Sequence, residues 1–439
     1  PKLRELKADD DLVVSDKDWI DTEKDTGGVR SGAKHYLDHI KHPPRDGNPE
    51  SNAEWWKGLS RDEKDAYLAL HADKVGALDG LPAVARDEAN RTVLAETHAE
   101  ASQKLHDFDR KNLEPAKYEQ KWNNITQLPI QGEQQVTLAW KNWNEKRSKL
   151  ADRLHAVEVI QGRLGQSGGD LPETYLLGFD PDVNHGDGRV IIASGNPDTS
   201  DHTAVYVPGS KTVMGNIGDE IDKSDELWRE SQKLAPGKSV SVVTWFDYDS
   251  PRTAKPFEDG DILPEAQSDS RAAEGAPRLR RFLDGNVAAH RAATGDKAHS
   301  TLVGHSYGTT LMGDAAKYKP NYHDLLADPL PVDDVVTVAS PGVQAKRPAD
   351  LGVNPHHWWA MASPDDNVPL GGRLGGLGDD WIVPTDGEFG ANIMVTDTEG
   401  HGGYWKRGEN GEASVSLKNQ ARVIAGRYDD VSLKAEAHW

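Results

Sequence analysis

A serine between two glycines is the strongest chemical signal in this sequence. Residues 304–308 read Gly-His-Ser-Tyr-Gly, after the apolar residues 300–303 and before a run of small residues, 309–316, that favours a helix. Glycines at both ends permit a sharp turn from strand to helix, which strains the backbone at the central serine and exposes its hydroxyl. The pattern predicts that Ser306 is a nucleophile. A structural glycine turn that contains a serine by chance is the alternative.

A serine hydroxyl is a poor nucleophile until a base removes its proton, so a catalytic histidine is expected later in the chain. His401 lies in the glycine-rich stretch 399–404, directly after the last predicted strand. Among the seventeen histidines, His305 is inside the serine turn, and His356 and His357 begin a predicted strand. His185, His202, His290 and His299 are among the histidines that precede the serine. The order along the chain favours His401 as the general base.

The acid that orients this histidine should lie between Ser306 and His401, just after a strand. The apolar stretch 358–362 is followed by Ser-Pro-Asp-Asp-Asn-Val-Pro at 363–369. We favour Asp366 because an Asp-x-Val run after a strand places the second aspartate at the turn, and Asp365 stays open as the alternative. Three aspartates in the next loop are interpreted as parts of a solvated turn: Asp379, Asp380 and Asp386.

Two backbone amides are expected to hold the oxyanion that forms when a serine attacks a carbonyl. The Tyr307 amide lies at the N-terminus of the helix after the serine, where developing negative charge is stabilised. The second donor should come from the loop that follows the strand 203–207, where Gly209 would let the backbone approach the substrate and Ser210 supplies the amide. A plain Pro-Gly turn is the alternative for this loop.

Signals for a metal or a cofactor are weak. The sequence contains neither H-E-x-x-H nor G-x-x-x-x-G-K-[ST]. Residues 180–184 are similar to the start of a calcium loop, but the next glycine comes one place late and position 12 is Ile191 instead of glutamate. We interpret this stretch as a surface loop and expect catalysis to need no cofactor.

The elements that would position these residues form a repeating pattern of strand and helix after residue 169. Predicted helices at 269–292 and 309–317 separate the later strands, several of which are nearly continuous apolar runs. The predicted strands are 190–193, 203–207, 240–245, 300–304, 335–339, 357–362 and 392–395. Apolar strands covered on both faces predict an α/β fold with a doubly wound, mostly parallel sheet.

Residues 50–165 differ from the rest because their apolar residues recur at helical spacing. Ser60 and Glu63 form a capping-box pattern, and one helix carries an apolar stripe that predicts a packing face, with a partner-binding groove as the alternative. The stripe comprises Val136, Trp140, Trp143, Leu150, Leu154 and Val157. Four glycines in 162–169 mark a boundary, which divides the chain into an all-helical module, 1–168, and a catalytic domain, 169–439.

The charge of the chain excludes one class of function. Lys and Arg number 51 against 72 Asp and Glu, which gives a net formal charge of −21, and the basic residues are scattered. Such a field repels phosphate backbones, so nucleic acid is not an expected partner. Anionic membrane surfaces are disfavoured in the same way, although a local neutral patch would still meet a lipid.

Neither the cysteine content nor the start of the chain identifies a compartment. The chain has no cysteine, and no apolar run approaches the roughly 20 residues that span a bilayer. The first ten residues lack the apolar core of a signal peptide, and the chain starts without methionine. We therefore expect a fragment or a processed form, and both a secreted and a cytoplasmic location stay open.

With these residues in view, the sequence resembles an actinobacterial α/β-hydrolase family first catalogued as a domain of unknown function. The resemblance implies an α/β-hydrolase fold with Ser306, Asp366 and His401 as triad positions. Its members often carry an upstream helical region similar to the helical hairpins of type VII secretion, which implies a secretion-system partner or an upstream helical domain. The marks of the resemblance are Trp56-x-x-Leu59-Ser60, Gly80-Leu81-Pro82, Arg86-Asp87, Asn90-Arg91, Val207-Pro208-Gly209, the stretch 304–308, and Gly400-His401 with Tyr404.

These residues together predict a serine hydrolase that cleaves a small-molecule or lipid carboxylic ester through an acyl-enzyme. The stretch 371–389, between acid and base, would then form a flap over an apolar mouth. A phospholipase, an amidase or a thioesterase would use the same triad. The alternative from another class is a non-catalytic binding module that retains the hydrolase fold.

Overall fold

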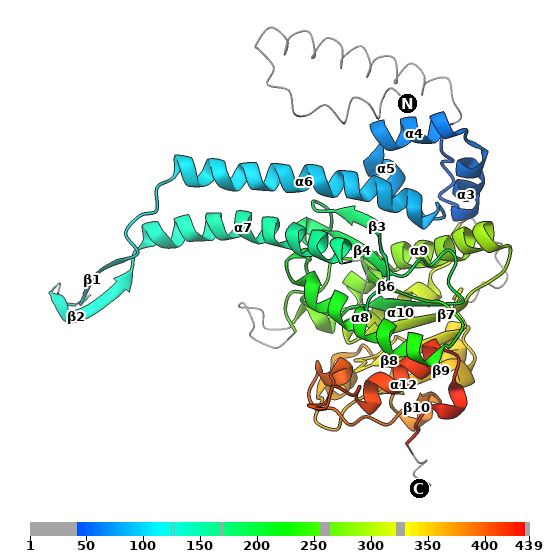
Figure 1. The fold of residues 1–439 in the computed structure, drawn as a ribbon. Coiled ribbons are helices and arrows are strands. Elements are labelled where there is room, and N and C mark those ends of the chain that lie inside the picture. The colour runs from blue at the N-terminus through cyan, green and yellow to red at the C-terminus, as the bar shows by residue number, and fades with distance from the viewer. Residues whose placement is uncertain are drawn as a thin grey trace.

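The computed structural model describes residues 42–123, 125–126, 128–166, 170–254, 264–321 and 330–434. Its centre is an eight-stranded sheet in the order β10-β9-β8-β7-β5-β6-β4-β3 (Figure 1). The strands are β3 Thr174–Asp180, β4 Arg189–Ser194, β5 His202–Val207, β6 Val240–Phe246, β7 His299–His305, β8 Asp334–Val338, β9 Trp358–Met361 and β10 Asn392–Ile393.

Six neighbouring strands of this sheet, from β10 to β6, run parallel, while β4 and β3 add an antiparallel edge. The seven predicted strands are all confirmed, although the last one covers only Asn392–Ile393. The sequence analysis missed β3, in which Gly178 interrupts the apolar residues. A mostly parallel sheet is what near-continuous apolar strands require, because both of their faces must be covered.

Side chains that alternate along β5 show how both faces are buried. Ala204 and Tyr206 pack in one apolar core with Leu417, whereas Val205 and Val207 pack in a second core on the opposite face. The period of two along a strand therefore sends successive side chains into two separate layers, which confirms the doubly wound arrangement. The helices that follow β5, β6, β7, β9 and β10 are, in this order, α8 Ile217–Leu234, α9 Ser270–Thr294, α10 Tyr307–Lys317, α11 Val368–Gly375 and α12 Val415–Ile424.

The region before the sheet is helical, as predicted, and its helices are α3 Pro49–Gly58, α4 Arg61–Leu70, α5 Ala72–Gly76, α6 Ala83–Lys111 and α7 Leu138–Gly165. The predicted capping box is confirmed at the start of α4. The Ser60 amide donates to Glu63 Oε2 at 2.6 Å, and the Glu63 amide donates to Ser60 Oγ at 3.3 Å. Residues 1–41 of the expected module lie outside the described residues.

A hairpin interrupts this helical region, so the expectation of an all-helical module is corrected there. Strands β1 Tyr118–Trp122 and β2 Pro129–Val136 pair antiparallel between α6 and α7. Every residue of β1 is exposed, as are most of β2, so neither strand has the alternation of apolar and polar residues that marks a half-buried strand. Figure 1 shows the hairpin at the end of the long projection formed by α6 and α7.

The expectation that one helix carries the whole apolar stripe is corrected at Val136, which belongs to β2, whereas the other five residues lie on α7. The stripe residues of α7 pack against α6 and the sheet. Val157 is fully buried, and Trp143 lies 6.2 Å from Phe108 of α6 between ring centroids. The Trp143 indole also donates to the Asn112 carbonyl at 3.0 Å. These contacts support the packing-face interpretation of the stripe.

Polar residues of α6 fasten this helix to the edge strand β3. Asp87 accepts the Leu176 amide at 2.7 Å, Asn90 donates to the Leu176 carbonyl at 2.9 Å, and Arg91 donates to the Thr174 carbonyl at 2.8 Å. An antiparallel edge strand leaves backbone groups unpaired, and these side chains satisfy them. The Asp87, Asn90 and Arg91 marks of the family resemblance thus serve the joint between helix and sheet.

The predicted boundary at 168 and 169 lies outside the described residues. At the base of α7, Ile160 and Leu164 share an apolar core with Leu176 and Val190 of the sheet. The division into two domains stays a prediction.

Candidate active site

The nucleophile turn has the sharp geometry that its glycines predict. Ser306 joins β7 to α10 with φ 53° and ψ −130°, a conformation that costs energy in a residue other than glycine. A Cβ at Gly304 would lie 2.1 Å from the Met312 sulfur, and one at Gly308 would lie 2.5 Å from the Val207 carbonyl oxygen. Larger residues would therefore open the turn, and the glycines are required for close packing.

His401 and Asp366 are brought together from two loops that follow adjacent parallel strands, β9 and β10. His401 Nδ1 lies 2.9 Å from Asp366 Oδ2 and 3.1 Å from Oδ1. The Asp366 side chain is 1% exposed, whereas that of His401 is 38% exposed. A buried carboxylate thus holds one nitrogen of an imidazole whose other nitrogen is left for a reacting group.

Three hydrogen bonds keep Asp366 ionised. Burial acts to raise the pKa of this carboxyl group, but hydrogen bonds from His401, the Val368 amide and the Tyr404 hydroxyl together hold the pKa below its usual range. The Tyr404 oxygen lies 2.7 Å from Asp366 Oδ2 and accepts the Ser363 amide at 2.9 Å. Tyr404 had been included only as a mark of the family resemblance, and the structure places it against the candidate acid.

Asp365, the alternative acid, has a different contact. Its two carboxylate oxygens accept the Gly400 amide at 2.9 and 3.1 Å. Asp365 therefore fixes the backbone before His401, while its neighbour Asp366 contacts the imidazole itself. The geometry favours Asp366, as the sequence did.

His305, the residue before the candidate nucleophile, contacts the loop of the candidate base. The His305 Nε2 atom lies 2.9 Å from the His401 carbonyl oxygen, and the two imidazole rings are 4.6 Å apart between centroids. Burial lowers the pKa of His305 well below its usual range, so this imidazole is neutral and its Nε2–H donates a hydrogen bond to the His401 carbonyl. The sequence analysis considered His305 only as a rival base, and its position inside the serine turn was the one available signal.

His401 therefore lies beside the nucleophile turn, through its contact with His305. Ser306 Oγ and His401 are both in the described part of the chain, and no hydrogen bond joins them there. Such contacts are often long before substrate binds and shorten in the complex.

The predicted oxyanion loop lies directly against the nucleophile. A Cβ at Gly209 would lie 2.7 Å from Ser306 Cβ, so only glycine allows this approach. The Gly209 carbonyl accepts the Tyr248 hydroxyl at 3.1 Å and the Thr212 hydroxyl at 2.9 Å. Because the N–H of a trans peptide points away from its C=O, these two bonds turn the Ser210 amide away from Tyr248.

The stretch predicted as a flap, 371–389, contains most of α11 and two short helices, Asp379–Trp381 and Gly387–Phe389. Gly372 anchors it, since a Cβ there would lie 1.7 Å from the Pro341 carbonyl oxygen. Leu370, Leu374 and Trp381 expose 52%, 69% and 65% of their surface. Three exposed apolar side chains therefore follow Asp366 in the sequence.

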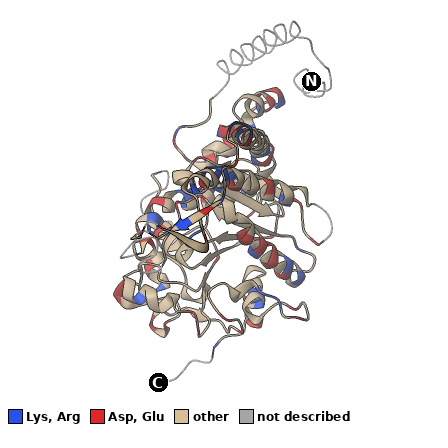
Figure 2. Cartoon of the chain, turned by 90° about the vertical axis from the view of Figure 1, so that its left-hand side faces the viewer, with Lys and Arg blue, Asp and Glu red and all other residues tan. Residues whose placement is uncertain are grey.

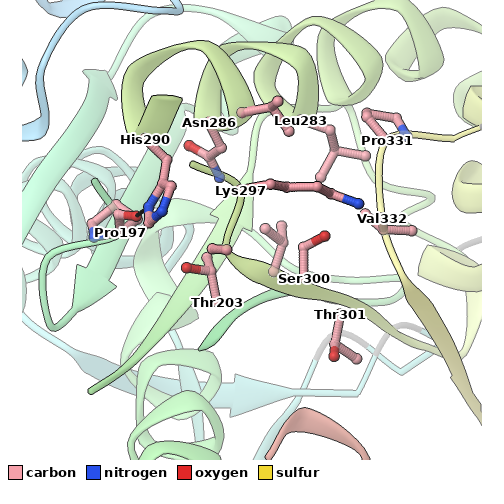
Figure 3. A pocket seen from close by; sticks show the side chains of 13 residues that line it. Pro197, Thr203, Leu283, Asn286, His290, Lys297, Ser300, Thr301, Pro331 and Val332 are labelled. Atoms are coloured by element: carbon pink, nitrogen blue, oxygen red, sulfur yellow. Dashed lines mark hydrogen bonds between the residues drawn. The ribbon is translucent and has the colours of Figure 1, made fainter. Parts of the chain in front are cut away.

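A cavity elsewhere in the molecule is separate from these residues. It is lined by Thr203 and Ser300, at the amino ends of β5 and β7, and by Asn286 and His290 of α9 (Figure 3). Ser306 follows the opposite, carboxyl end of β7. The cavity volume of about 30 Å³ suits one or two water molecules rather than an acyl group.

Within the described residues, no group of three or more His, Asp or Glu side chains is arranged to hold a metal ion. No helix of that part of the chain combines the length and the apolar character needed to cross a membrane.

The sheet order, the serine turn after β7 and the helices on both faces define the fold as that of an α/β hydrolase. A family described as "Alpha/beta hydrolase" matches residues 182–375, which include Ser306 and Asp366 but end before His401. The match supports a hydrolase and agrees with the family that the sequence resembles.

Similar curated proteins come from mycobacteria. The chain is 28% identical over 419 residues to "Uncharacterized protein Rv2079" of Mycobacterium tuberculosis (strain ATCC 25618 / H37Rv), which covers 88% of this chain and 57% of that protein. It is 28% identical over 237 residues to "Uncharacterized protein Mb0988c" of Mycobacterium bovis, which covers 52% of this chain and 76% of that protein. The chain thus spans little more than half the length of the first of these relatives.

Solved structures similar to this chain include several esterases. The crystal structure of esterase PE8 has a TM-score of 0.29 and 17% identity, and covers 52% of this chain and 93% of its own. A hyperthermophilic esterase from Pyrobaculum calidifontis has a TM-score of 0.33 and 12% identity, and covers 64% of this chain and 91% of its own.

Proposed function

We propose that this protein is a serine hydrolase that cleaves carboxylic esters with Ser306 as nucleophile, His401 as general base and Asp366 as orienting acid. The observation that carries the proposal is the pair of His401 Nδ1 and the buried Asp366 carboxylate, 2.9 Å apart, beside a serine held in a strained turn. A neutral imidazole whose Nδ1–H is held by a carboxylate presents Nε2 as the base, which is the state that proton removal from a serine requires.

In the first step His401 Nε2 takes the proton of Ser306 Oγ while this oxygen attacks the ester carbonyl carbon. The carbonyl oxygen then carries a negative charge, which the amides of Tyr307 and Ser210 stabilise by hydrogen bonds. His401 returns the proton to the departing alkoxide, and the acyl group stays on Ser306. The imidazolium that forms on the way is stabilised by Asp366, whose lowered pKa keeps it ionised.

In the second step water attacks the acyl-enzyme, and His401 takes a proton from the water. The same two amides hold the second oxyanion. As it collapses, His401 returns the proton to Ser306 Oγ, which restores the serine and releases the carboxylic acid. The support for the amide positions is the contact of Gly209 with Ser306 and the two hydrogen bonds that fix the Gly209 carbonyl.

The exposed apolar side chains Leu370, Leu374 and Trp381 support an ester with an apolar acyl group. They lie on and after α11, which begins two residues after Asp366. When a hydrocarbon chain covers such side chains, apolar surface is removed from water, which favours binding. Medium-length acyl esters should therefore be better substrates than acetyl esters.

The test is the hydrolysis of p-nitrophenyl esters of increasing acyl length by the purified chain and by Ser306→Ala and His401→Ala. Each substitution should lower kcat by at least about a thousandfold. Ser102→Ala and His106→Ala, both exposed on α6, are matched controls and should leave the rate unchanged.

Retention of the rate in Ser306→Ala would contradict the proposal. An inactive, well-folded wild type that fluorophosphonates do not label would favour the non-catalytic binding module. The implied secretion-system partner or upstream helical domain stays a prediction.

A further inference from the structure

Two buried aspartates outside the triad lie at the same edge of the sheet as the serine turn. Asp187, in the loop between β3 and β4, is 7% exposed, and Asp249, which follows β6, is 4% exposed. The start of β4 pairs with the carboxyl end of β6, since Val190 lies opposite Phe246. The two loops therefore meet at the carboxyl edge of the sheet, where Ser306 follows β7.

Each of these carboxyl groups has one oxygen with a donor and one without. Asp187 Oδ1 accepts a hydrogen bond from Arg252 at 3.1 Å. Asp249 Oδ2 lies 2.6 Å from His185 Nδ1 and also accepts a hydrogen bond from Arg271. Among the described residues, Asp187 Oδ2 and Asp249 Oδ1 are buried and have no hydrogen-bond donor. A buried carboxyl oxygen without a donor costs free energy, so a further species is expected between these two atoms.

A proton is the species that fits. The two carboxyl groups are hydrogen-bonded to each other, which requires that one of them is protonated, because two carboxylates have no donor. Burial, the negative charge of Asp249 and this hydrogen bond raise the pKa of Asp187 to about 6, although Arg252 acts against them. Within the described part of the chain, no third His, Asp or Glu joins the two aspartates in a metal-binding arrangement.

The charges around the pair balance when it holds one proton. Acidic and basic residues are interspersed along the described chain, so local contacts decide the state of a buried carboxyl group (Figure 2). Glu265 lies 3.6 Å from Arg271 and accepts the Arg252 amide at 2.8 Å. One negative charge on Glu265 and one on the singly protonated pair then neutralise the two arginines. The other charged or titratable side chains nearby are His185, and Asp247 with its partners Arg189 and Arg278.

Hydrogen bonds connect the pair to the predicted oxyanion loop, which we define as residues 208–214. The Met214 amide donates to the Asp187 carbonyl at 2.8 Å. The hydroxyl of Ser250, the residue after Asp249, donates to the Thr212 carbonyl at 2.7 Å. A change in the separation of the two aspartates would therefore move the oxyanion loop.

The residue after Ser210 depends on this support. Lys211 has φ 66°, in the left-handed region that costs energy in a residue other than glycine. Its amide donates to the carbonyl of Pro251, two residues after Asp249, at 2.8 Å. Because the Ser210 amide is the second oxyanion donor of the proposed reaction, movement of this loop would misplace a hydrogen bond in the transition state.

We propose that Asp187 Oδ2 and Asp249 Oδ1 share one proton, and that this pair positions the oxyanion loop for ester hydrolysis. When the proton passes to water, two adjacent carboxylates repel each other, and the loops that hold residues 211–214 separate. Both aspartates are positioning residues, since they act through the loop. The positioning role rests on the proposed function, whereas the shared proton does not.

Urea unfolding of the wild type and Asp187→Asn tests the shared proton. The folded wild type keeps this proton up to about pH 6, whereas the unfolded chain loses it near the ordinary aspartate pKa of 3.8, so stability falls as the pH rises between these values. An asparagine donates the same hydrogen bond without titrating. From about pH 5 to about pH 8, the urea midpoint of the wild type should fall by about 0.3 M more than that of Asp187→Asn.

The matched control is Asp182→Asn, in the same loop but with a side chain 73% exposed, which should follow the wild type. Asp249→Asn should be less stable than the wild type at both pH values, because Arg271 and His185 lose the carboxylate that they contact. A wild type and an Asp187→Asn variant with the same pH dependence would overturn the shared proton.

Hydrogen exchange follows the oxyanion loop without any need for hydrolase activity. After correction for the intrinsic effect of pH, the Lys211 and Met214 amides of the wild type should exchange at least about threefold faster at about pH 8 than at about pH 5.5. In Asp187→Asn these two amides should show no such change. Equal exchange at both pH values in the wild type would overturn the positioning role.

The rate of ester hydrolysis gives the second readout of the loop. The ratio of kcat for Asp187→Asn to kcat for the wild type should rise by about threefold over the same pH range, because the titration of His401 is common to both chains and cancels. A constant ratio in an active enzyme would also overturn the positioning role. A wild type that hydrolyses no ester would contradict the proposed function alone, since unfolding and hydrogen exchange still decide on the pair and the loop.

Discussion

At the scale of single residues, the candidate site depends on contacts among side chains from four loops. Ser306 and His401 could be predicted from the sequence because the glycines around the serine and the order along the chain are visible there. The roles of Tyr404 and His305 could not, since these depend on which loops meet at the carboxyl edge of the sheet. A tyrosine 38 positions after Asp366 gives no sign of a 2.7 Å hydrogen bond to it.

The two aspartates should have separable effects on catalysis. Asp366→Asn should lower kcat by about a thousandfold or more, because an amide in this position favours the wrong tautomer of His401. Asp365→Asn should lower kcat by less than about tenfold, since it affects only the contact with the Gly400 amide. Steady-state kinetics on a soluble ester distinguishes them, and a larger loss for Asp365→Asn would reverse the assignment.

Tyr404→Phe should affect both stability and rate. The change removes a donor to the buried Asp366 carboxylate and an acceptor for the Ser363 amide. We expect the free energy of unfolding to fall by about 1 to 3 kcal/mol and kcat to fall by roughly tenfold, with little change in KM. Urea unfolding and initial rates measure the two effects. An unchanged kcat would show that Tyr404 does not position the acid.

At the scale of elements, the sheet could be predicted well because buried parallel strands leave continuous apolar runs in the sequence. The hairpin β1–β2 could not, because exposed strands carry no such signal and its residues have mixed propensities. The strand β3 was missed although most of its residues are buried, because Gly178 interrupts its apolar residues. The close packing of α11 on Pro341 was likewise hidden, because Gly371 and Gly372 look the same in the sequence.

These two glycines offer a direct test of how α11 is held. Gly372→Ala should destabilise the protein by about 1 to 3 kcal/mol, because its Cβ would overlap the Pro341 carbonyl. Gly371→Ala is the matched neighbour with nothing within 4 Å of the added Cβ, and alanine is a better helix former, so it should be neutral or stabilising by up to about 1 kcal/mol. Thermal unfolding of both variants decides, and equal effects would mean that α11 is not anchored at this contact.

At the scale of the whole molecule, a histidine buried at the amino edge of the sheet couples folding to pH. His202 is 4% exposed, and burial, with a smaller effect from His299, lowers its pKa to about 4. The unfolded chain takes up this proton near the ordinary histidine pKa of 6.5, whereas the folded chain does so only near 4. The contribution of His202 to stability is therefore complete above about pH 6.5 and is lost as the pH falls toward 4.

His202→Gln should consequently lose less stability on acidification than the wild type. Asp247 and Asp314, whose pKa burial raises to about 6, act in the opposite sense, but they are present in both chains and cancel in the comparison. Urea unfolding at about pH 7 and about pH 5 measures the difference. Parallel losses in the two chains would mean that His202 takes up its proton equally in both states.

The central claim for the whole molecule is that one serine, activated by one histidine, does the chemistry. The most direct measurement is mass-spectrometric mapping of the residue that a fluorophosphonate modifies in the intact chain and in His401→Ala. We predict a single adduct on Ser306 in the wild type and none in His401→Ala. An adduct on another residue, or hydrolysis of esters by a chain that carries no adduct, would contradict the account.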